Sequence, residues 1–95
     1  MIKHVVCFKL SDKQAQAQKT KEVLLSMQGN VPMLRGIEVG VDQLESNRSY
    51  DVMLTVLLDD MQALCDYQND AYHVGVVKKY MHSVAVSSVA MDYEI

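Results

Sequence analysis

The stretch from Tyr50 to Leu58 constrains the fold of this chain more than any other segment. Its side chains alternate with the period of a β-strand, and one row is apolar throughout: Tyr50, Val52, Leu54, Val56 and Leu58. The opposite row, with Met53, Thr55 and Leu57, is also largely apolar. Because both faces of such a strand must be shielded from water, we expect it to be covered on both sides.

Two elements are predicted before the next strand. Alternation over Ile2 to Leu10 indicates a first strand. Ser11 and Gln14 form a capping box for a helix over residues 12–28, which ends where Gly29 can supply a left-handed C-cap. A second strand follows over Met33 to Leu44, where Gly36 and Gly40 interrupt the side-chain rows and indicate a bulge or a close backbone approach.

The second half of the chain contains a helical region with a break. Asp59 or Asp60 can cap a helix that carries Tyr67 in its last turn, and a second helical segment begins at Asp70. The break therefore falls at residues 68–70. Alternating side chains from His82 to Ile95 predict a last strand.

The predicted order is strand, helix, strand, strand, helix, strand. It matches an α+β, ferredoxin-like βαββαβ fold, in which both helical regions cover one face of an antiparallel sheet. The chain has 95 residues and no linker, so residues 1–95 are expected to form a single domain. Since 49% of the residues are hydrophobic and the far face of the sheet carries Met53 and Met91, we predict a homodimer whose two sheets pack into a barrel.

Composition excludes several function classes. The net charge of −3 and the lack of a basic cluster longer than Lys78-Lys79 argue against a nucleic-acid partner. The sequence has no apolar run of membrane-spanning length and no signal-peptide pattern, so we expect no membrane partner and a cytoplasmic location. Cys7 and Cys65 lack metal-ligand spacing and are predicted to be buried, reduced thiols.

Several short motifs together resemble one family. They are Lys3 to Leu10, the pair Val39-Gly40, the pair Tyr50-Asp51, and Asp66-Tyr67 through His73-Val74-Gly75. In order and spacing they resemble the stress-responsive A/B barrel domain (Dabb) proteins of the dimeric α+β barrel group, and the resemblance covers nearly the whole chain.

Within that family the sequence is similar to the plant polyketide cyclase that closes olivetolic acid. The resemblance implies catalysis without metal or organic cofactor, by a Tyr and His pair that falls on Tyr67 and His73 and with a strand histidine that falls on His4. Two features depart from the family. The common His-Pro-x-His reads Asp70-Ala71-Tyr72-His73 here, and Leu24 stands where the cyclase has bulkier aromatic side chains.

The residues themselves support the same site. With Asp70 as N-cap, His73 occupies the third helical position, where the positive end of the helix dipole favours a neutral imidazole able to accept a proton. Tyr67 can polarise a carbonyl or hold an enolate oxygen. His4 shares a strand face with Val6 and Phe8, and we predict that these three residues, Leu24, Tyr67 and His73 line an apolar ligand pocket.

Other interpretations stay open at this point. Tyr67 and His73 can simply complete a small core, and a metal site from His4, His73 and Asp70 lacks any typical ligand spacing. Whether the chain is an enzyme is uncertain; as an enzyme it would be a lyase or isomerase resembling a polyketide cyclase, acting on a small carbonyl or phenolic ligand. The alternatives are a non-catalytic stress-response protein that functions by assembly and a cofactor-free oxygenase.

Overall fold

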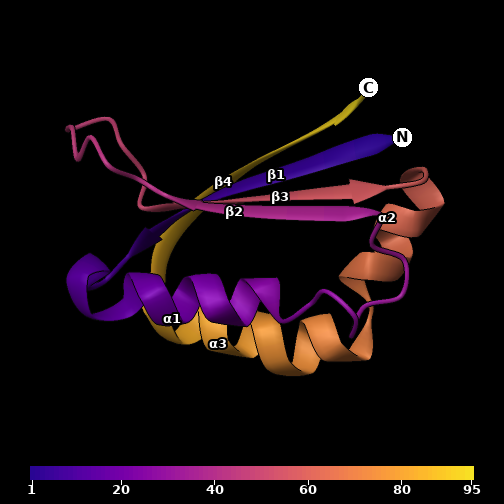
Figure 1. Ribbon diagram of the computed structural model, residues 1–95, viewed down its shortest axis with the longest axis horizontal. Helices are drawn as coiled ribbons and strands as arrows, with labels where there is room; N and C mark the ends of the chain where they lie inside the picture. Colours follow the sequence, from indigo (N-terminus) through magenta and orange to yellow (C-terminus); the bar gives the residue numbers. More distant parts are fainter.

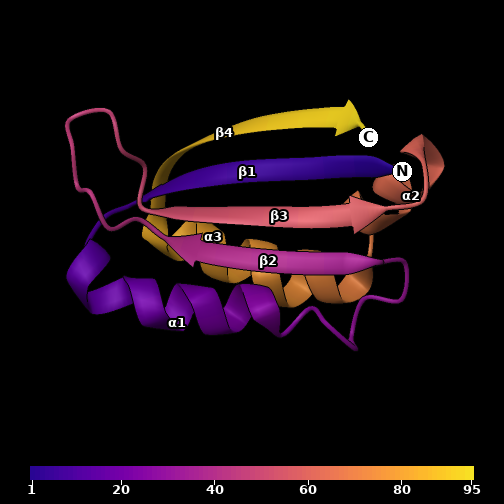
Figure 2. The ribbon, with the colours of Figure 1, turned by 45° about the horizontal axis from the view of Figure 1, so that its top comes forward.

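A computed structural model describes residues 1–95, which form one antiparallel sheet and one layer of helices. The elements in order are β1 (Ile2–Leu10), α1 (Lys13–Leu25), β2 (Gly36–Val41), β3 (Val52–Leu58), α2 (Met61–Gln68), the π-helical segment η1 (His73–Lys78), α3 (Lys79–Val84) and β4 (Ala85–Glu94). Figures 1 and 2 show the helices on one side of the sheet and the other side bare. The predicted ferredoxin-like fold is confirmed.

The strand order is β2-β3-β1-β4, so β3 and β1 lie in the centre. The helical layer explains the inner apolar row of β3, because it covers that face of the sheet, whereas Met53 in the outer row is exposed. Val52, Leu54 and Val56 face the helices and are almost fully buried. The partners of β1 are fixed residue by residue, with His4 opposite Val56 on one side and Asp92 on the other.

The core lies between the sheet and the helices. It contains Leu24 of α1, Tyr67 of α2 and Val77 of η1, each at most 2% exposed, packed against the inner rows of β1 and β3. Fully burying an aliphatic side chain of this size contributes about 1.5–3 kcal/mol. The core therefore fixes the helices over the same sheet face that carries His4.

The first helix is shorter than predicted and begins with a different cap. Asp12, not Ser11, is the N-cap: its carboxylate accepts a hydrogen bond from the backbone of Ala15 at 3.2 Å, while the Gln16 side chain accepts one from the backbone of Asp12. The helix ends at Leu25. Gly29 does adopt a left-handed conformation, with φ 87°, but only after a further stretch of turns.

The second and last strands are also shorter than predicted. β2 pairs with β3 without a register shift, so the glycines mark no bulge there. Gly36 is instead a close approach, because a Cβ at this position would lie 3.0 Å from the Leu57 side chain, whereas Gly40 has open space. Residues His82 to Val84 belong to α3, since the apolar stripe of Met81 and Val84 continues the helix into the core.

The helical break predicted at residues 68–70 is confirmed, and the segment after it is tied to α1. The Tyr72 and Ser26 hydroxyl groups lie 2.7 Å apart, and the Tyr80 hydroxyl lies 3.3 Å from the hydroxyl of Thr20. These two hydroxyl pairs join α1 to the helix that carries His73. The tyrosines thus fix the spacing of the helical layer.

The outer face of the sheet is exposed and apolar. Met53 is 43% exposed, Val89 51% and Met91 66%. The prediction that both cysteines are buried is wrong for Cys65, which is exposed because it lies on the outer side of α2; Cys7 is half-buried, and both thiols are free. None of the helices is long and apolar enough to cross a membrane.

Candidate functional site

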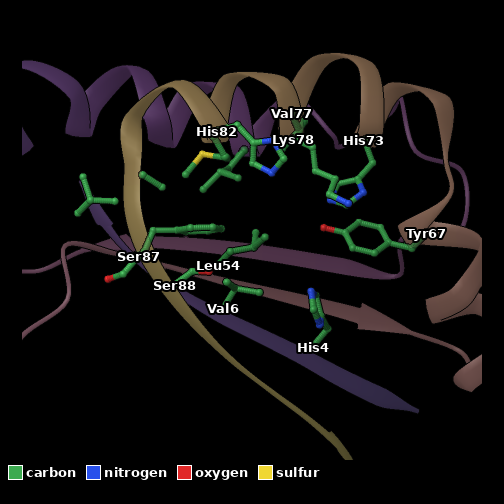
Figure 3. A pocket seen from close by; sticks show the side chains of 15 residues that line it. His4, Val6, Leu54, Tyr67, His73, Val77, Lys78, His82, Ser87 and Ser88 are labelled. Carbon is green, nitrogen blue, oxygen red and sulfur yellow. The ribbon is translucent and has the colours of Figure 1, made fainter. Parts of the chain in front are cut away.

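A cavity of about 370 Å³ lies between the helical layer and the sheet. Figure 3 shows His73, Lys78 and His82 extending from the helix toward the strands, with Tyr67 and His4 at one end of the space. All six residues predicted from the sequence line this cavity: His4, Val6, Phe8, Leu24, Tyr67 and His73. Sequence positions from four separate elements thus meet at one place.

Asp70 places His73 at the start of its helix. The Asp70 carboxylate accepts a hydrogen bond from the backbone N–H of His73 at 3.0 Å, which is the N-cap geometry expected from the sequence. The helix then continues through η1, where the backbone bonds span five residues instead of four. Short π-helical segments of this kind are frequent at functional sites.

The His73 imidazole is stacked on the Tyr67 ring. The ring centroids are 4.2 Å apart with an interplanar angle of 28°. Burial is the main cause that lowers the pKa of His73, and the positive charge of Lys78 acts in the same direction. The expectation of a neutral imidazole is supported, although burial, not the helix dipole we invoked, is the leading cause.

One ring nitrogen of His73 has no partner. Nδ1 is the one buried side-chain nitrogen or oxygen atom in the protein that makes no hydrogen bond. Leaving a buried polar atom unpaired costs about 1–3 kcal/mol, and such atoms in native proteins call for a ligand, a water molecule or a catalytic role as explanation. Nδ1 thus lacks the partner that a core histidine would need, while the backbone of Gln68 lies close enough to the ring to act against the lowering of its pKa.

Tyr67 stays a neutral phenol, because burial and the nearby Asp70 carboxylate raise the pKa of its hydroxyl group well above the ordinary value. The hydroxyl has a single contact within the protein, a weak hydrogen bond to the Met27 thioether at 3.7 Å. Sulfur is a poor acceptor. The Tyr67 O–H is therefore free to donate to a stronger acceptor in the cavity.

His4 of β1 is oriented by Asp92 of β4. Nδ1 of His4 bonds directly to a carboxylate oxygen of Asp92, as the pairing of these two positions in the sheet allows. The His4 ring also meets Tyr67 edge-on, at 5.6 Å between centroids. Sequence analysis missed Asp92; the signal was an acidic residue that follows Ser88 and Ala90 in the row facing the helices.

The mouth of the cavity contains further residues that the sequence did not single out. Lys78 and His82 line the cavity together with Ser87 and Ser88. Lys78 was missed because η1 changes the helical phase, and His82 was missed because the helix continues past it. No three side chains of the metal-binding types gather closely enough to hold a metal ion.

This arrangement combines a neutral imidazole, a phenol donor and an apolar chamber. Nine of the fifteen lining residues are hydrophobic. Of the polar ones, His4 and His73 lie at the end where Tyr67 lies, whereas His82, Ser87 and Ser88 lie toward the opposite end. A neutral imidazole can accept a proton, and a phenol can stabilise an oxygen that becomes negative. The site is suited to proton transfer on a small, partly apolar molecule.

Solved structures share this fold closely. A dimeric protein of unknown function from Bacteroides fragilis has a TM-score of 0.85 at 25% identity, over 99% of this chain and 95% of that one. A Dabb family protein from Mesorhizobium loti has a TM-score of 0.76 at 18% identity, over 99% and 95% of the two chains. A hydroxynitrile lyase from Passiflora edulis has a TM-score of 0.80 at 13% identity, over 99% and 92%. For the Mesorhizobium loti and Passiflora edulis proteins, whose sequence identities are 18% and 13%, the similarity concerns the fold alone.

No curated protein sequence matches the chain well enough to count as a relative. The family model for the stress responsive A/B barrel domain, in contrast, matches residues 2–95. The motifs at Lys3 to Leu10 and at Tyr67 to Gly75 therefore belong to a match that spans the whole fold. This chain is a member of the stress responsive A/B barrel domain (Dabb) family.

Proposed function

We propose that the protein is a cytoplasmic homodimer whose cavity binds a small, partly apolar carbonyl or phenolic compound, and that His73 removes a proton from it. The carrying observation is the stacked His73 and Tyr67 pair at one end of the cavity, with a ring nitrogen that no protein group occupies. The cavity volume falls in the range of about 300–1,000 Å³ that is typical of small-molecule sites. The free thiols of Cys7 and Cys65 fit a reducing compartment.

The proposed reaction begins at a carbon next to a ligand carbonyl. The neutral His73 takes a proton from that carbon, the C–H electron pair moves into the carbonyl, and the resulting enolate oxygen accepts a hydrogen bond from Tyr67. Returning the proton to another carbon gives an isomerase. Alternatively, the enolate carbon attacks a second carbonyl of the same ligand, the π electrons of that carbonyl move to its oxygen, and the resulting alkoxide takes the proton back from His73. This closes a ring, as in the reaction of a polyketide cyclase.

His4 is assigned a positioning and binding role. Its Nδ1 faces Asp92, so Asp92 fixes the ring orientation and leaves the other nitrogen for a ligand. The edge-on contact with Tyr67 keeps the phenol ring in its place between the two histidines. Phe8 and Leu24 supply the apolar surface against which the ligand body packs.

The homodimer is supported by the bare face of the sheet. Exposed Met53, Val89 and Met91 form an apolar surface, and such surfaces mark association sites. The Bacteroides fragilis protein, 25% identical over nearly the whole chain, is dimeric. Two copies of this face packed together would cover the outer rows of β3 and β4.

Assembly without catalysis is the second candidate, because the same apolar sheet face favours it. Assembly alone predicts that the space beside His73 is filled by the protein's own side chains. The volume of about 370 Å³ beside that residue supports a ligand instead. No feature of the site favours an oxygenase.

Proton exchange tests the proposal directly. Phenylacetone in D₂O is the probe, because its carbon-bound protons next to the carbonyl exchange slowly without a catalyst and are followed by proton NMR. We expect the wild-type dimer to accelerate the exchange, His73→Ala to abolish the acceleration, and Tyr67→Phe to reduce it by about 10²-fold or more, the usual loss when one oxyanion donor is removed.

Tyr80→Phe serves as the matched control, because Tyr80 lies on the same helical layer but outside the cavity. It should leave the exchange rate unchanged. Circular dichroism and sedimentation must show that each variant remains a folded dimer. If folded His73→Ala still accelerates exchange as the wild type does, the assignment of the base is wrong.

A further inference from the structure

The π-helical segment η1 brings a lysine onto the face of the helix that carries His73. In an α-helix of 3.6 residues per turn, a residue five positions on lies about 140° round the axis and faces away. In η1 the backbone bonds join positions five apart, so Lys78 comes round above His73. Both side chains consequently line the cavity.

The mouth of the cavity is rich in donors that have no acceptor within the protein. Lys78 forms no ion pair, and neither the His82 ring nor the hydroxyls of Ser87 and Ser88 make a hydrogen bond. No acidic residue is among those that line the cavity. In a chain of net charge −3, the lining of this cavity therefore carries one formal positive charge, that of Lys78, and no negative charge.

The donors also lie on the side away from the one nearby carboxylate. Asp92 is engaged by His4 at the end where Tyr67 lies, while Figure 3 shows His82, Ser87 and Ser88 toward the opposite end and Lys78 between them and His73. A ligand whose reacting carbonyl lies beside Tyr67 would therefore reach the donors with its other end. The polar groups at that end can all donate hydrogen bonds, and Lys78 adds a positive charge.

From this placement we propose that the ligands of the cavity carry a carboxylate, which Lys78 and His82 bind at the mouth while the carbonyl end lies beside His73 and Tyr67. The substrate class is a small keto acid with an apolar body. This inference rests on the proposed function, since it identifies the chemical group at the other end of the same ligand. Lys78 is then the residue that determines specificity for the anion.

A pair of probes of matched shape tests it: 4-oxo-4-phenylbutanoate and its primary amide, measured by calorimetric titration and by deuterium exchange next to the ketone. We expect the wild type to bind the carboxylate about two- to fivefold more tightly than the amide, the range for a partly exposed ion pair, with the preference falling at high salt. Lys78→Gln should remove the preference. Lys79→Gln, one residue on and outside the cavity, should keep it.

The outcomes separate this inference from the proposed function. If the wild type binds the two probes equally while still exchanging phenylacetone protons, the anion site is wrong and the proton-transfer function stands. If Lys78→Gln keeps the preference, or Lys79→Gln removes it equally, the assignment to Lys78 is wrong. If neither probe binds and phenylacetone is not exchanged, both proposals fail.

Discussion

Replacing Tyr67 with Phe tests whether its hydroxyl serves the fold or a ligand. The side chain is 1% exposed, stacked on His73 and packed against the core, so its ring matters for stability. The hydroxyl has only the Met27 sulfur as partner, at 3.7 Å. We expect Tyr67→Phe to lower the free energy of unfolding by less than about 1 kcal/mol, below the mean for a normal hydrogen bond.

Two comparison variants set the scale. Tyr67→Ala removes the whole ring and should cost about 3–5 kcal/mol, as large aromatic truncations in cores do. Tyr72→Phe breaks the 2.7 Å contact between the Tyr72 and Ser26 hydroxyls and should cost about 1 kcal/mol, the typical value for a formed hydrogen bond. Of the three variants, Tyr67→Phe should therefore lower the free energy of unfolding least. It should nevertheless strongly reduce the rate of proton exchange.

The assay is urea unfolding followed by far-UV circular dichroism at one fixed protein concentration, because the stability of a dimer depends on concentration. For a domain of this size, 1 kcal/mol corresponds to a shift in melting temperature of about 4–8 °C. If Tyr67→Phe lowers the free energy of unfolding by more than about 2 kcal/mol, the hydroxyl is structural. The availability of that hydroxyl to a ligand would then be refuted.

Three other changes have defined outcomes. Asp70→Ala removes the cap on His73 and Asp60→Ala the cap on α2; each should cost about 1 kcal/mol in unfolding experiments, but only Asp70→Ala should slow proton exchange. Burial lowers the pKa of His73, so the unfolded chain binds a proton there more readily; stability should fall as pH drops below the ordinary value of 6.5, and His73→Gln should flatten this slope in unfolding curves measured across pH. Met91→Lys, on the bare sheet face, should yield monomers in sedimentation, whereas Met61→Lys on α2, equally exposed, should not; a dimer that survives Met91→Lys would place the interface elsewhere.

The sequence by itself determined the order of elements, the two apolar rows of Tyr50 to Leu58 and the helix start at Asp70. These features depend on side-chain period and on short-range hydrogen bonds, which the chain carries locally. Part of the cavity could be predicted for the same reason, since His4, Val6 and Phe8 share one strand face and His73 follows its cap by three positions. Leu24, and the pairing of Tyr67 with His73, came from the family resemblance.

Only the tertiary structure decided how the site is completed. The pairing of β1 with β4 puts Asp92 beside His4, 88 positions away along the chain, and no local pattern encodes a register over that distance. The π-helical phase of η1 turns Lys78 into the cavity, although an α-helical count directs it to solvent. Packing also stacked His73 on Tyr67 without a hydrogen bond between them, because the core fixes both rings and leaves Nδ1 of His73 without a partner.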